Sequence, residues 1–139
     1  MIILRNWLVT ITFNPAEDTL FAELPNVEEF GVGELKHALE IVADNVISYD
    51  VKNLLLDSTN VSVGKMDDRE YGLTVKDFIR KLTRTRLQRF ARLNSSILSL
   101  DHRALTAVTE IFNQEGSSIQ FQVFNSGTAA AEWLRAQVN

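Results

Sequence analysis

Near its amino terminus the chain shows the period-2 alternation that is typical of β-strands. Every second residue from Trp7 to Phe13 is apolar, which predicts a strand with one buried face. The turn-forming stretch 14–19 separates this strand from a second one over 20–24. Because the polar connection is short, we expect the two strands to form an antiparallel hairpin.

The rest of the chain carries apolar residues at helical spacing in four stretches. They predict helices over 33–48 and 68–84, a third from a cap at Asp101 to a stop at Gly116, and a last one capped by Ser126 or Thr128. The predicted buried stripes are Leu35, Ala38, Leu39, Val42 and Val46; Tyr71, Val75, Phe78, Ile79 and Leu82; Ala104, Leu105, Val108, Ile111 and Phe112; and Ala130, Trp133 and Leu134.

The stretch Val51–Asp57 is the centre of the predicted fold. Its run of three leucines has no alternation, which indicates a strand buried on both faces and therefore covered by helices on both sides. Weaker strand patterns follow over 87–93 and 119–124, the latter alternating with glutamines as near a sheet edge. The order ββαβαβαβα predicts an α/β fold with a five-stranded mixed sheet and helices packed on it.

Composition places the chain among ordinary globular proteins. With 139 residues it predicts a single domain spanning 1–139. The absence of cysteine excludes disulfides and thiolate metal sites and agrees with a reducing compartment. No basic region precedes the first apolar residues, so we expect no signal peptide and a cytoplasmic location. A net charge of −4 argues against nucleic-acid binding.

The closing segment carries a family resemblance. With the predicted order and a central strand that ends in Asp57, Phe124, Ser126, Ala130 and the pair Trp133–Leu134 resemble the small bacterial SpoIIAA-like proteins of the STAS fold. The resemblance implies a hairpin followed by a β/α superhelix, and a regulatory binding module that is not an enzyme. It also implies apolar ligands held between sheet and helices, and contact with membranes.

A phosphorylation-controlled switch is the alternative function. Anti-sigma-factor antagonists of the STAS type carry a phosphorylated serine in an Asp-Ser-Ser-Gly turn. This chain has Asp57, Ser58, Thr59 and Asn60 in sequence, without the glycine. Ser58 and Thr59 are therefore the candidate phosphoacceptors of that hypothesis.

The residues with catalytic chemistry do not form a recognisable motif. Asp57 ends the central strand, where open α/β sheets bind ligands, but an aspartate there also caps loop amides, and we favour the capping role. His37 and His102 are the two histidines of the chain, and their separation is no metal-ligand spacing. We expect neither catalytic residues nor a metal or other cofactor.

Charge is distributed unevenly along the chain. Seven of the fourteen basic residues fall between Lys76 and Arg92, whereas residues 1–50 hold nine acids against two basic residues. At helical spacing Lys76, Arg80 and Arg84 share one face. This face is either a solvated helix surface or an interaction surface for an acidic partner, anionic lipid headgroups or a second copy of the chain.

Aromatic residues indicate where a small molecule would bind. Tyr71 and Phe78 lie on the stripe that faces the sheet, and they are ordinary core or the lining of a ligand pocket. Our leading hypothesis is a non-enzymatic module that recognises a protein partner or an apolar small molecule. Peripheral membrane contact and homodimer formation remain open in that hypothesis.

Overall fold

The computed structural model describes residues 2–5, 8–24, 32–59, 68–93, 106, 108–114, 116 and 118–136. Its strands are β1 (Ile2–Arg5), β2 (Thr10–Asn14), β3 (Thr19–Glu23), β4 (Asn53–Asp57), β5 (Arg89–Leu93) and β6 (Gln120–Phe124). Its labelled helices are α1 (Val32–Ser48), α2 (Asp68–Thr83) and α4 (Gly127–Ala136). Residues 108–114 are also helical.

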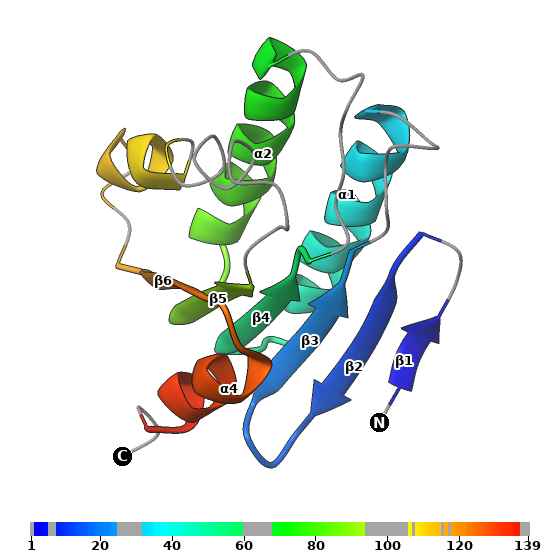
Figure 1. Cartoon of the computed structure of the whole chain (residues 1–139), viewed down its shortest axis with the longest axis vertical. Helices are drawn as coiled ribbons and strands as arrows, with labels where there is room; N and C mark the ends of the chain where they lie inside the picture. Colours follow the sequence, from blue (N-terminus) through cyan, green and yellow to red (C-terminus); the bar gives the residue numbers. More distant parts are fainter. Residues whose placement is uncertain are drawn as a thin grey trace.

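The six strands form one mixed sheet in the order β1-β2-β3-β4-β5-β6 (Figure 1). The predicted hairpin is confirmed, because β2 and β3 pair antiparallel, and β3 to β6 run parallel. The prediction of five strands was wrong. Ile2–Arg5 adds a sixth strand that pairs antiparallel with β2. This strand has four residues, too few to show an alternation pattern in the sequence. It forms because the neighbouring strand supplies its hydrogen bonds.

The chain order of the parallel strands explains where the helices lie. Strands β3 to β6 are added one after another in the same direction, and right-handed crossovers then place every connecting helix on the same face. In agreement, side chains from α1, α2 and residues 108–111 share one core cluster with that face of the sheet. Helix α4 follows the last strand, has no crossover to satisfy, and packs on the opposite face against β4, β5 and β6.

Strand β4 is buried on both faces, as its leucine run predicts. Leu54 and Leu56 belong to the large core beneath α1 and α2. Leu55 points the other way and packs beneath α4 with Ala91 and Leu134. All three leucines are at most 4% exposed, so the sandwich of helices around this strand is confirmed.

Helix α1 ends in a Schellman motif that directs the chain into β4. The amide of Val51 donates to the carbonyl of Val46 (3.3 Å), and the amide of Asp50 donates to the carbonyl of Ile47 (3.2 Å). Asp50 has φ = 50°, the left-handed conformation that this motif requires and that glycine usually supplies. Val46 and Val51 are both buried, which adds the apolar contact that usually accompanies the motif.

The other predicted elements agree with the structure where it describes them. The stripes of α1 and α2 are buried, as are Val108, Ile111, Ala130 and Leu134, whereas Phe112 and Trp133 are half-buried. Ser126 caps α4, because its Oγ accepts from the amide of Ala129 at 3.4 Å. Gly116 has φ = 62°. Trp7, Asp101, His102, Ala104 and Leu105, which also carried predictions, lie outside the described residues.

Candidate functional site

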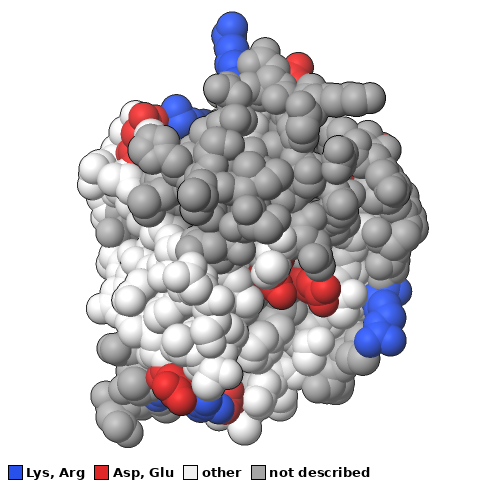
Figure 2. Space-filling view, viewed as in Figure 1, with Lys and Arg blue, Asp and Glu red and all other residues white. Residues whose placement is uncertain are grey.

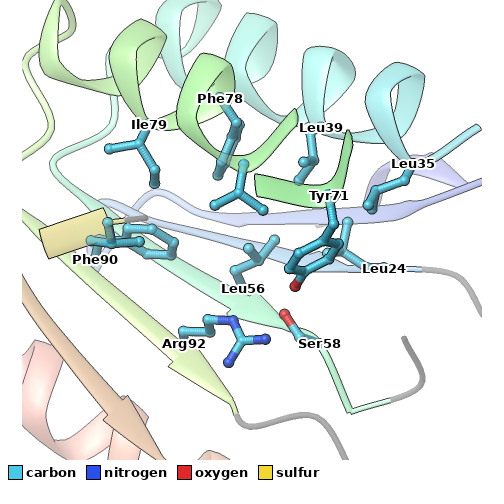
Figure 3. A pocket seen from close by; sticks show the side chains of 12 residues that line it. Leu24, Leu35, Leu39, Leu56, Ser58, Tyr71, Phe78, Ile79, Phe90 and Arg92 are labelled. Carbon is cyan, nitrogen blue, oxygen red and sulfur yellow. The ribbon is translucent and has the colours of Figure 1, made fainter. Parts of the chain in front are cut away.

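A small apolar cavity lies between the sheet and the helices α1 and α2. Tyr71, Phe78 and Ile79 reach into it from α2, and Leu35 and Leu39 from α1 (Figure 3). Tyr71 and Phe78, the two predicted pocket residues, are therefore brought together in its lining. The cavity measures about 30 Å³, the space of roughly one water molecule. The side chains that line it therefore leave little open space between them.

One end of this cavity is polar. The Tyr71 hydroxyl, the Ser58 hydroxyl and the Arg92 guanidinium gather beside the carboxyl ends of β4 and β5 (Figure 3). All three side chains are buried, with exposed fractions of 3%, 2% and 4%. Arginine is almost never this buried without a polar partner, so the guanidinium of Arg92 needs polar groups around it at this end of the cavity.

A larger groove lies on the surface between α1 and α2. It measures about 360 Å³, within the size range of ligand sites. Leu39 and Phe78 form its apolar part. The charged side chains that line it are Lys36, Arg80, Lys81 and Arg84, together with Glu40 and Asp77.

The predicted basic face is divided by this arrangement. Arg80 and Arg84 line the groove, where Arg80 forms an ion pair with Asp77 (3.4 Å). Lys76 is not part of the groove; its Nζ lies 2.7 Å from a carboxylate oxygen of Glu110, on the helical segment 108–114. The groove instead gains Lys36 from α1 and Lys81 from α2, which sequence reasoning did not place there.

The groove and the cavity share a wall. Leu39 and Phe78 line both spaces, so they separate the surface groove from the polar end around Arg92. Phe78 is held on its inner side by Phe90, with ring centroids 6.3 Å apart in an edge-to-face arrangement. A change in the rotamers of Leu39 and Phe78 would connect the two spaces.

The two candidate phosphoacceptors differ in exposure. Ser58 is buried at the polar end of the cavity, whereas Thr59 is exposed. Asp57 accepts a hydrogen bond from the Thr59 amide at 2.9 Å and another from the Thr59 hydroxyl. The capping role expected of Asp57 is thus present, and of the two hydroxyl groups only that of Thr59 is accessible to a kinase in this conformation.

A second surface groove lies on the α4 side of the sheet. It measures about 310 Å³ and is lined by Thr10, Thr12 and Phe21 at one side and by Glu23 and Asp57 at the carboxyl ends of β3 and β4.

Within the described residues, no three histidine, aspartate or glutamate side chains gather as metal ligands, and His37 is exposed on α1.

Sequence reasoning missed the polar end of the cavity, although one signal was present. Arg92 stands two residues after Phe90, so strand alternation places both side chains on the same face. Ser58 follows Leu56 by the same spacing. Once Leu56 and Phe90 are taken as core, Ser58 and Arg92 are expected to face the same interior.

Among the residues that the structure describes, no helix has the length and apolar character to cross a bilayer. No protein-family model, curated protein or solved structure matches the chain. The resemblance to SpoIIAA-like proteins therefore stays a prediction.

Proposed function

We propose that this protein is a binding module of STAS-like type, which recognises an acidic segment of a protein partner in the groove between α1 and α2. The observation that carries the proposal is the sign of the charge in that groove. Four cationic and two acidic side chains line it, although the whole chain has a net charge of −4. A local field opposite to that of the whole molecule steers and orients acidic partners.

Three of the cations are available to a partner. In the described part of the chain, the side chains of Lys36, Lys81 and Arg84 form no ion pair, and all three are exposed. Each can therefore form a charge-assisted hydrogen bond with a carboxylate without first giving up an intramolecular partner. Such bonds at a solvent-exposed rim chiefly set specificity and association rate.

Apolar surface at the groove supplies the remaining affinity. Leu39 and Phe78 form its floor but are only 5% and 4% exposed, so most of the apolar contact area comes from Leu73, which is 49% exposed and lies on α2 one turn before Asp77. An amphipathic helix whose apolar side chains pack on Leu73 beside the groove, while its carboxylates meet the basic rim, fits this surface. The expected partner is therefore a helical segment that carries both leucine-type and acidic residues.

Fluorescence anisotropy with labelled model helices tests this proposal. The probe is an acidic amphipathic peptide built from leucine and glutamate, and its lysine-for-glutamate counterpart is the comparison. We expect the acidic peptide alone to bind, with an affinity that falls as salt is raised. Lys81→Glu and Arg84→Glu should each weaken binding about tenfold or more. The matched control is Arg86→Glu, because Arg86 belongs to the same basic run, is 80% exposed and pairs with Asp50 outside the groove.

The outcomes separate the candidate partners. Equal binding of both peptides, or equal loss with Arg86→Glu, would refute recognition at this groove. Binding to phosphatidylglycerol vesicles but not to the acidic peptide would transfer the function to an anionic membrane surface. Sedimentation with such vesicles, compared with pure phosphatidylcholine vesicles, distinguishes these two results.

A second candidate function rests on the polar end of the cavity. A buried guanidinium with two hydroxyl groups at the end of an apolar space is suited to the acidic head of an apolar small molecule. Because the cavity is about 30 Å³, such a molecule enters only when Leu39 and Phe78 move aside. Native mass spectrometry of protein incubated with long-chain fatty acids tests this function. The parent protein should gain the mass of one bound fatty acid, and Arg92→Leu should abolish this gain. An unchanged mass for the parent protein would remove this candidate.

A further inference from the structure

The two edge strands of the sheet differ in how they are protected against pairing with another chain. Strand β1 has four residues, ends in Arg5, and shifts register between Ile2 and Leu4. A short length, a charge and a bulge are the usual devices that protect an edge. Strand β6 has neither the charge nor the bulge: its five residues Gln120–Phe124 contain no charged residue and no proline, and its register with β5 is unbroken. No strand among the described residues pairs with its outer side.

The orientation of the β6 backbone shows which groups face outward. The amide of Gln120 donates to the carbonyl of Gln88 at 2.9 Å, on the β5 side. Successive residues of a strand direct their amide and carbonyl groups to opposite edges. The amides and carbonyls of Phe121 and Val123 are therefore directed outward, and those of Gln120 and Gln122 inward.

This arrangement is self-complementary. If two copies of β6 meet antiparallel about a twofold axis at Gln122, Phe121 of each copy stands opposite Val123 of the other. Both residues direct their backbone groups outward, so each such pair exchanges two hydrogen bonds. Gln122 then faces its own counterpart at a pair without hydrogen bonds, where the Cα atoms are about 4.5 Å apart. This register is symmetric, the backbone orientation allows it, and it uses the outward-facing groups of both Phe121 and Val123.

The surroundings of β6 also suit an interface. From Ser118 to Ala131 the chain has no charged residue, and Figure 2 shows the surface over β6 without charged atoms, which gather elsewhere on that face. Depletion of charge distinguishes the centre of protein interfaces from other surfaces. Gln120 and Gln122 are exposed, and Phe121, Val123 and Phe124 are half-buried.

We propose that β6 pairs with β6 of a second copy, so that a twofold dimer forms with one continuous sheet through both molecules. The proposal is independent of the groove between α1 and α2, which lies on other elements. A symmetric dimer of this kind leaves both grooves accessible, and it presents them to a partner in pairs.

Cysteine cross-linking tests the register directly, because the chain contains no cysteine. In Gln122→Cys the two thiols meet across the axis at a distance that a disulfide spans. In Gln120→Cys the equivalent atoms are about 14 Å apart, since four residues at about 3.4 Å each separate them, and no disulfide can form. We expect a covalent dimer under mild oxidation for Gln122→Cys only, with Gln88→Cys as an exposed control one strand away.

Charge at the axis provides the second test. Gln122→Lys and Gln122→Glu each place two like charges opposite one another, which should raise the dissociation constant about fivefold or more. An equimolar mixture of the two variants should regain the dimer, because the charges then become complementary. Analytical ultracentrifugation of the parent chain and these variants measures both effects. A parent chain that stays monomeric up to high protein concentration, or a dimer that cross-links equally well at position 120 or at neither position, would overturn the proposal.

Discussion

Leucine-to-alanine substitutions in β4 measure whether helices cover both faces of the sheet. Leu54 is fully buried beneath α1 and α2, and Leu55 is 4% exposed beneath α4. Either substitution removes three methylene-sized groups, which at about 0.8 kcal/mol each amounts to about 2.4 kcal/mol. A residual cavity adds to this cost, so we expect a loss of about 2.5–5 kcal/mol at both positions.

The two positions should respond alike although they face opposite layers. In a sheet with one wet face, adjacent residues alternate between buried and exposed, so only one of the two substitutions would cost this much. Leu73→Ala is the control, because that side chain is 49% exposed on α2 and alanine is the better helix former. We expect a change of about 1 kcal/mol or less there.

Urea denaturation followed by circular dichroism gives the free energy of unfolding of each variant. Fluorescence provides an independent probe, since Trp133 packs on Phe124 in the layer beneath α4 with ring centroids 5.7 Å apart. A loss at Leu55 no larger than that at Leu73, beside a large loss at Leu54, would refute the packing of α4 on the sheet. Equal slopes of free energy against urea are needed for the comparison.

Three further predictions concern single residues. Asp50→Gly should stabilise the protein by about 0.5–1 kcal/mol in thermal denaturation, because glycine adopts the left-handed conformation of Asp50 without strain and the exposed ion pair that is lost contributes little; a lower melting temperature would contradict this. Phe78→Ala should cost about 3–5 kcal/mol and join the cavity to the groove, so the native variant should bind an apolar dye such as 1-anilinonaphthalene-8-sulfonate, and unchanged dye fluorescence would argue against the shared wall. If the phosphorylation alternative holds, phosphate-affinity gels of protein from its native host should lose a shifted band with Thr59→Ala but retain it with Ser58→Ala, because Ser58 is buried; the reverse pattern would contradict that assignment.

Patterns of one residue type along the chain predicted the layers of this fold. The leucine run of β4 predicted two covered faces, and both coverings are present. The glutamines of β6 predicted an edge strand, and β6 is the last strand of the sheet. Both predictions succeeded because burial acts on each residue locally, so it leaves a periodic trace in the sequence.

Features that depend on pairing between distant segments were not predictable in this way. Strand β1 has too few residues to show a period and exists because β2 offers it hydrogen bonds. Lys76 does not line the groove with Arg84 but pairs with Glu110, which approaches from another helix. The groove likewise combines Lys36 with Lys81, which are distant in sequence and meet only after α1 packs on α2.

The position of α4 has a consequence for the order of folding. Synthesis runs from the amino end, so the residues of β1 to β6 are made before those of α4. During that interval Leu55 and Ala91 have no cover from α4, and nascent chains with such bare apolar surface are prone to aggregate or to recruit chaperones. Substitutions that weaken the docking of α4 should therefore lower the yield of folded protein in cells more than they lower its stability once purified.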